Sequence, residues 1–296
     1  MSSSRGEFRK RLLGEYAVTA PSLLWMTLFF LLPTLIIFAI AFRSRGEFGG
    51  IGDQWTLETL KSLSYPNYPS IIWRTIWMSV ACTGLTLAIA IPVAYYIARV
   101  SARTRDLVML LTIIPFWTNF LIRIFAWKSV LHPEGMLKAF LVWCHVLSPD
   151  AILLYRPEAV LVVMVYTELP FAILPLYAAA EKFDFSLFEA AMDLGASRLY
   201  AFFHVFVPGI GEGVLSACLM VLIPCVGSYV IPDMVGGKDS MMIGNIIVRT
   251  TLENRNIPAA AALSAVMTLV MFLPLLYFLK RKKNPDGSAS PAKEVV

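Results

Sequence analysis

One acidic residue lies inside a long apolar run of the sequence, where its side chain could do chemistry. Glu168 belongs to Val165–Pro170, and an ionisable residue in such a run is a candidate pathway residue, because burying its charge in lipid is costly. Carboxylates and aromatic faces together can hold a cation. The residues that could complete a cation path with Glu168 are Trp117, Tyr166, Tyr229 and Asp233.

Each of these residues also has a plainer interpretation, which the sequence leaves open. A single aromatic side chain often belongs to an interfacial belt or to helix packing. Glu168 could form an internal pair with Arg123, and Asp233 could cap a loop. Arg123 would itself repel a cationic substrate unless it is neutralised or points away from the path.

The other reactive side chains indicate no metal site, no cofactor and no catalytic centre. The four cysteines include no CxxC pair, and the three histidines are scattered, which does not fit a membrane-embedded enzyme. Gly236–Ser240 imitates a phosphate-binding loop, but Pro232 stands where an earlier glycine is needed and Asp239 replaces Ser or Thr. We therefore expect a protein that is not an enzyme, with any ATP hydrolysed by a separate subunit.

The composition places the chain in a membrane. Hydrophobic residues make up 58% of it, charged residues 15%, and the mean hydropathy is +0.69. A helix needs roughly 20 apolar residues to span a bilayer, and the apolar residues fall into several such blocks. We predict an all-α integral membrane protein with six transmembrane helices at about 21–42, 71–98, 107–127, 158–180, 205–231 and 258–279.

Basic residues set the orientation of these spans. They cluster in the N-terminal segment 1–20, in the link 99–106 and directly after the last span. An even number of spans puts all three clusters on one side, and the positive-inside bias makes that side the cytoplasm, with both termini. The six-span domain is then 21–283, and the tail 284–296 is predicted to be disordered. Because the net charge of +5 is concentrated in these clusters, we expect no nucleic-acid partner.

The second cytoplasmic link, 181–204, carries a distinctive motif. Small alanines after Glu189 allow a short helix to fit closely into a groove, Gly195 lets the backbone leave helical geometry, and Pro208 can open the next span. The spacing resembles the EAA loop of ABC importer permeases: Glu-Ala-Ala, three residues, Gly, nine residues, then two aliphatic residues one apart and Pro. The matching residues are Glu189, Ala190, Ala191, Gly195, Val205, Val207 and Pro208. An ordinary amphipathic surface helix with a glycine cap is the alternative.

This resemblance implies a fold and a set of partners. The fold is the type I ABC importer permease fold, in which the loop is a cytoplasmic coupling helix that fits a cleft on the ATPase subunit. The implied partners in the bacterial inner membrane, besides lipid, are a second homologous permease, two ATP-binding subunits and a periplasmic substrate-binding protein. A secondary transporter commonly shows an internal repeat, of which this sequence has no convincing example, and it would leave the motif unexplained.

Further segments resemble one subfamily, the spermidine/putrescine permeases. They are Pro115–Trp127, Gly227–Gly237, Met242–Asn245 and Asn254–Pro258. The resemblance implies polyamines as the transported molecules. The subfamily also includes importers of opines and related amines, and its members often carry an acidic residue where this chain has Ser228. Opines or other amine derivatives therefore stay open as alternatives.

Overall fold

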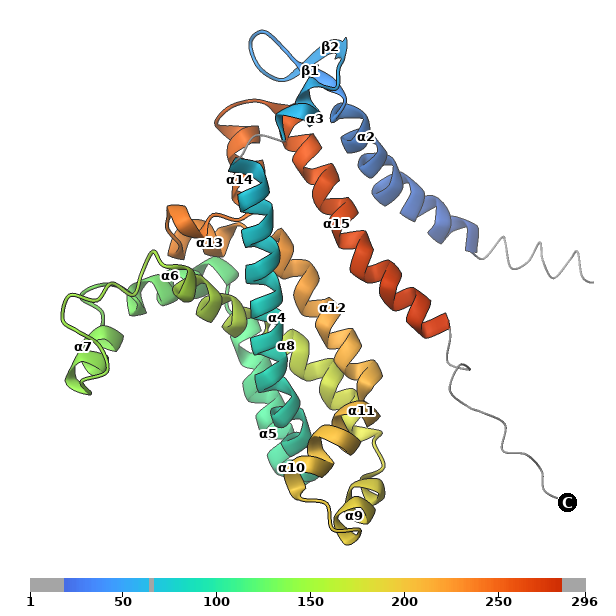
Figure 1. The fold of residues 1–296 in the computed structure, drawn as a ribbon, viewed down its shortest axis with the longest axis vertical. Coiled ribbons are helices and arrows are strands. Elements are labelled where there is room, and N and C mark those ends of the chain that lie inside the picture. The colour runs from blue at the N-terminus through green and yellow to red at the C-terminus, as the bar shows by residue number, and fades with distance from the viewer. Residues whose placement is uncertain (1–18, 64–66, 284–296) are drawn as a thin grey trace, which may run out of the picture. The chain divides into compact units, whose positions relative to one another are not determined.

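The chain divides into two compact units, which are described separately. The computed structural model describes residues 19–63 and 67–283. The middle unit is Pro66–Ile246, and the end unit combines Met1–Tyr65 with Ile247–Val296 (Figure 1). The predicted tail 284–296 and all but the last two residues of the predicted N-terminal segment 1–20 lie outside the described residues.

The regular secondary structure in the described part of the middle unit is all helical. Its first half contains α4 (Asn67–Arg99), α5 (Ala102–Ile113), the 3-10 helix η2 (Ile114–Trp117), α6 (Phe120–Val130), α7 (Met136–Trp143) and α8 (Pro157–Glu181). Its second half contains α9 (Phe185–Asp193), α10 (Arg198–Ala201), the π-helix η3 (Phe202–Phe206), α11 (Val207–Gly209), α12 (Gly211–Gly227), α13 (Val230–Val235), the 3-10 helix η4 (Lys238–Ser240) and α14 (Ile243–Leu252). The last turns of α14 extend into the end unit.

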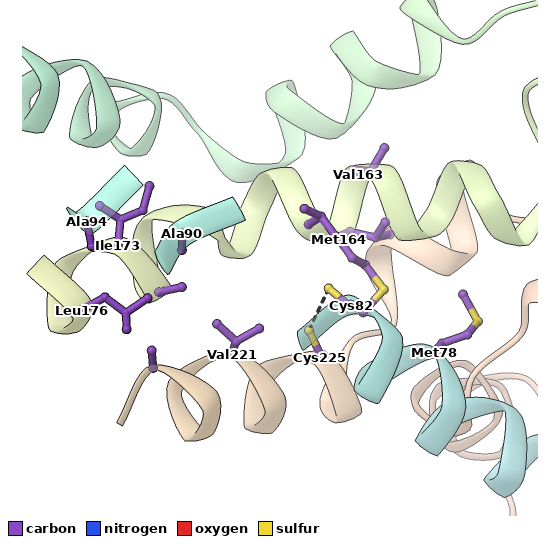
Figure 2. Packing of buried hydrophobic residues seen from close by; sticks show 14 of the residues in the cluster. Met78, Cys82, Ala90, Ala94, Val163, Met164, Ile173, Leu176, Val221 and Cys225 are labelled. Carbon is purple, nitrogen blue, oxygen red and sulfur yellow. Dashed lines mark hydrogen bonds between the residues drawn. The ribbon is translucent and has the colours of Figure 1, made fainter. Parts of the chain in front are cut away.

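Three long helices, α4, α8 and α12, form the core of this unit and pack along one another (Figure 1). Small residues let them approach closely, as is common between helices in lipid. A Cβ built on Gly213 of α12 would lie 2.3 Å from the Cβ of Ala179 on α8. Figure 2 shows the apolar contact layer, where the Cys225 Sγ of α12 lies 3.4 Å from the Cys82 Sγ of α4. Both cysteines are buried free thiols.

Two of the predicted spans turn sharply inside their apolar run. The helices Ala102–Trp117 and Phe120–Val130 meet at 95°, because Thr118 is extended and Asn119 caps the second helix by accepting a hydrogen bond from the Leu121 amide. The helices Arg198–Gly209 and Gly211–Gly227 meet at 75°, with Ile210 outside both.

The end unit combines helices with a small hairpin. It contains a π-helical turn η1 (Thr27–Leu31), α2 (Leu32–Ile40), strands β1 (Arg43–Arg45) and β2 (Ile51–Trp55), α3 (Glu58–Ser62) and α15 (Ile257–Lys283). The strands pair antiparallel with Arg43 opposite Trp55, and α15 packs along α2 (Figure 1). Gly49 and Gly50 have φ of +91° and +81° in the hairpin loop, a conformation in which glycine is not strained. The hairpin lies between the predicted first and second spans, where the sequence analysis predicted no strands.

Apolar helices overlap the predicted spans in position, although two of them are bent. Among the described residues, three helices are long and apolar enough to cross a membrane, namely Thr19–Ile40, Tyr68–Arg99 and Pro157–Glu181. The number rises to five if each bent pair is one span. The predicted sixth span falls on α15, whose apolar run Ile257–Phe272 is described. A span count of six remains a prediction. The predicted fifth span 205–231 is not one straight helix, since α12 starts at Gly211, after Pro208, and ends at Gly227.

Candidate functional site

The helix α9 contains the Glu-Ala-Ala sequence and is capped at both ends. The Asp184 side chain accepts a hydrogen bond from the Ser186 amide at 3.0 Å, which satisfies an N-terminal donor and holds the pKa of this carboxyl below its usual value. At the other end, Gly195 has φ +92°. Its amide donates to the Met192 carbonyl (2.9 Å) and the Ala196 amide to the Ala191 carbonyl (3.0 Å). This pair of bonds is a Schellman cap, which ends the helix at the predicted glycine.

The exposed surface of α9 is partly apolar. Glu189, Ala190 and Gly195 are exposed, and Leu194 beside them is 90% exposed. These exposed side chains are available for contact with a partner protein. The second half of the motif lies elsewhere, because Val205 is half-buried in η3 and Pro208 is exposed in α11, before the 75° turn. Only the first half of the motif therefore lies on the helix itself.

A group of aromatic rings attaches α9 to the rest of the unit, and we call it the Tyr95 cluster. The Tyr95 ring of α4 lies at the centre, with ring centroids 5.6 Å from Phe188 and 4.9 Å from Phe206. Phe188 is the buried residue of α9, and Phe206 belongs to η3. The members of the cluster are Tyr95, Phe183, Phe185, Phe188, Phe202 and Phe206. No motif in the sequence pointed to this grouping, because it joins a ring of α4 to rings of the distant segment 183–206.

Glu168 lies on α8 with one buried oxygen, Oε2, that has no hydrogen-bond partner among the described residues. The same holds for the Nε of Arg123. No ion pair in the described ranges joins these two residues, so the alternative of an internal Arg123–Glu168 pair is not realised here. The Arg123 guanidinium instead lies over the rings of Phe116 (5.2 Å) and Phe120 (5.9 Å).

The structure brings two other path candidates together. Asn245, a buried residue of α14, donates from Nδ2 to the Tyr229 carbonyl (2.8 Å) and more distantly to the Asp233 Oδ1 (3.5 Å). Its own Oδ1 accepts from the Met242 amide (3.1 Å). Asn245 thus fixes the segment that carries Tyr229 and Asp233. The sequence analysis cited this residue only as part of a resemblance and gave it no role.

The remaining path candidates lie apart from these two. Tyr166 packs edge-on against Trp127 of α6, with centroids 5.3 Å apart, and Trp117 is 81% exposed at the end of η2. In the part of the chain that the structure describes, no hydrogen bond, ion pair or ring contact joins Glu168 to Trp117, Tyr229 or Asp233. Among the described residues, Asn245 joins Tyr229 and Asp233, and the other candidates are not joined by direct contacts, so the path assignment stays a prediction.

Comparison with known proteins gives the family. Residues 90–282 match the family model described as "binding-protein-dependent transport system inner membrane component". The spermidine/putrescine transport system permease protein PotB of Escherichia coli (strain K12) is 36% identical over 88% of this chain and 94% of that protein. The chain belongs to this permease family. PotB of Haemophilus influenzae is likewise 36% identical over 88% of this chain and 91% of its own length.

A solved structure of an ABC transporter shares the fold. A crystal structure of a bacterial ABC transporter involved in the import of the polysaccharide alginate matches with a TM-score of 0.75 over 96% of this chain and 100% of that chain. At 17% identity this likeness concerns the fold alone. The permease is thus an inner-membrane subunit of an ABC importer with the all-α type I fold that the sequence predicts.

Proposed function

We propose that this permease imports polyamines such as spermidine and putrescine. The observation that carries the proposal is the 36% identity to PotB, which extends over nearly the full length of both chains. Another relative, the inner membrane ABC transporter permease protein YdcU of Escherichia coli (strain K12), is only 28% identical over 91% of this chain. The identity to a polyamine permease is therefore higher than the level shared with that more general relative.

The candidate path residues support a cationic substrate. Glu168 offers a carboxylate oxygen that is not used by any neighbour in the described chain, and Asp233 is an exposed carboxylate held beside Tyr229. Carboxylates suit ammonium groups, and aromatic faces suit both the charge and the methylene stem of a polyamine. Arg123 keeps its positive charge, but its guanidinium lies over two phenylalanine rings and forms no ion pair with Glu168 in the described chain, so that carboxylate stays available to a cation.

The exposed face of α9 supports a contact with an ATPase subunit. We propose that Glu189, Ala190, Ala191 and Gly195 form this contact, and that Val205 and Pro208 connect it to α12. The complete importer would contain a second homologous permease, two ATP-binding subunits and a periplasmic binding protein, with both termini of this chain in the cytoplasm. This chain would then be a conduit and a gate without catalytic residues, and closure of the ATPase would move α9.

Uptake measurements test the substrate and the contact separately. Cells that express the other transporter subunits, with and without this chain, are given radiolabelled putrescine or spermidine, with unlabelled amines and opines as competitors. We expect uptake to require the chain and to be blocked by unlabelled polyamine. Polyamine uptake that is the same without the chain, or competition by opines alone, would contradict the proposed substrate.

Variants of α9 test the contact. Glu189→Lys reverses a charge on its exposed face, and Glu158→Lys is a matched control at the start of α8, where Glu158 pairs with Arg156 on the surface. We expect Glu189→Lys to abolish uptake while the protein is still inserted, and Glu158→Lys to retain uptake. Normal uptake with Glu189→Lys would remove this residue from the contact.

A further inference from the structure

The helix α9 is joined by the backbone to two of the three core helices, α8 and α12, but not to the third, α4. The backbone joins α9 to α8 through a short turn and to α12 through α10, η3 and α11. The helix α4 has no such link, since its last residue, Arg99, lies far from α9 in the sequence. A displacement of α9 can reach α4 through α8 and α12, which both pack against α4. It can also reach α4 through direct side-chain contacts.

The Tyr95 cluster supplies these contacts on the α4 side. Tyr95 lies within 6.1 Å of the Phe185 centroid and 5.6 Å of the Phe188 centroid, both on α9, and within 5.4 Å of Phe202 on η3. Several of these pairs meet edge to face, the arrangement that aromatic rings favour. Phe183 extends the packing to α11, where a Cβ on Gly209 would come within 2.4 Å of its ring. Close packing of this kind transmits displacement because it leaves no free space.

Arg99 completes the contact one turn further along α4. Its guanidinium lies 5.4 Å from the Tyr95 centroid, 5.5 Å from Phe185 and 5.7 Å from Phe188. It also donates a hydrogen bond to the Tyr95 hydroxyl. Among the described residues it forms no ion pair, so its charge is directed to the rings rather than to a carboxylate. Two of these rings belong to α9 and one to α4, so the guanidinium contacts both helices.

We propose that Tyr95 and Arg99 are positioning residues that couple the motion of α9 to α4. The inference rests on the proposed function, since it assumes that an ATPase subunit moves α9. When α9 shifts, the rings of Phe185 and Phe188 carry Tyr95 and Arg99 with them, and α4 moves together with α8 and α12. Loss of the Arg99 contact leaves the ATPase contact on α9 intact but weakens the coupling between α9 and α4, since the Tyr95 ring contacts remain.

The test measures how much substrate is imported for each ATP hydrolysed. The complete importer is reconstituted in liposomes with radiolabelled spermidine and its binding protein, and copurification of the ATPase subunit is scored first. We expect Arg99→Ala to keep the ATPase subunit and its basal hydrolysis, and to lower import per ATP by about five-fold, the order expected for solvent-exposed cation–π contacts. Arg99→Lys, which keeps the cation, should recover most of this loss. The matched control is Arg103→Ala, an exposed cation of the same link with no ring contact among the described residues.

Three outcomes overturn the inference. The first is an unchanged import per ATP with Arg99→Ala, and the second is an equal loss with Arg103→Ala. The third is loss of the ATPase subunit from Arg99→Ala, since the cluster would then shape the docking surface rather than transmit motion. Failure of the proposed function gives a different result, because spermidine uptake would then not require the chain at all.

A second pair of variants, at Tyr95, tests the inference if Arg99→Ala does not fold. Tyr95→Phe keeps the ring and removes only the hydroxyl that Arg99 contacts, whereas Tyr95→Leu removes the ring contacts with four phenylalanines. We expect import per ATP to fall about five-fold with Tyr95→Leu and to stay within about two-fold of the unaltered protein with Tyr95→Phe, given the modest net free energy of one exposed hydrogen bond. Equal values for the two variants would contradict the role of the ring.

Discussion

The glycine that ends α9 allows a substitution whose cost comes from the backbone alone. Gly195 has φ +92°, and a Cβ built on it would meet no atom within 4 Å. Gly195→Ala therefore creates no steric overlap with other residues, but it forces an L residue into the left-handed region at a cost of about 1–2 kcal/mol. That cost corresponds to a factor of roughly 5–30 in an equilibrium. If the ATPase subunit binds only the capped form of α9, its affinity should fall by up to that factor.

The assay is a titration of the detergent-solubilised permease complex with its purified ATPase subunit. Gly195→Asn should lose less affinity than Gly195→Ala, because asparagine tolerates left-handed backbone better than alanine. The control is Gly84→Ala in α4, where the added Cβ also meets nothing within 4 Å and the φ is not positive. Alanine favours a helix interior over glycine by about 1 kcal/mol, so this control should bind normally. Unaltered affinity with Gly195→Ala, or a larger loss with asparagine than with alanine, would refute the reasoning.

Three further predictions concern packing, charge and pH. Gly213→Ala places a Cβ 2.3 Å from that of Ala179 and should lower the thermal unfolding temperature through an overpacking cost of about 1–3 kcal/mol, whereas Gly211→Ala, in open space, should not. Glu168→Gln should weaken uptake of the dication putrescine more than basal ATP hydrolysis, and an unchanged uptake rate would take Glu168 out of the path. The Asp184 cap has a lowered pKa, so it stabilises α9 fully above the usual aspartate pKa of 3.8 and loses this effect as the pH falls through the lower folded value. Amide exchange in α9, corrected for its intrinsic rate, should therefore rise only on strong acidification, and an equal rise in Asp184→Asn would contradict the assignment.

The position of α9 and its ends could be predicted from sequence because the signals are local. The residues from Glu189 to Gly195 predicted both a short helix and its C-terminal cap, and the structure places the cap at Gly195. Long apolar runs likewise gave the helices α4 and α8 to within a few residues. Hydropathy reports the length of an apolar run but not whether the helix bends within it. The turns near Thr118 and Ile210 were therefore missed, although Pro115 and Pro208 lie close to them.

Features that depend on distant contacts were beyond the sequence. Asn245 acquires its role only because it meets the backbone of Tyr229, and Tyr95 only because rings from α9 and η3 surround it. The hairpin β1–β2 is short and β2 is mostly exposed, so these strands lack the alternation of buried and exposed side chains by which a strand is predicted. The assignment of individual path residues remains a prediction, because the candidates lie on separate elements.

The thiol contact between α4 and α12 has a practical consequence for studies of the working transporter. Cys82 and Cys225 are 143 residues apart in sequence, but their sulfur atoms lie 3.4 Å from each other in the packed state (Figure 2). Mercuric ion, which binds two thiolates with release of their protons, or a short reagent with two thiol-reactive ends can bridge them only while the two helices remain adjacent. The two native cysteines therefore report whether α4 and α12 are adjacent. The yield of the bridge at each stage of the ATP cycle would record when α4 separates from α12.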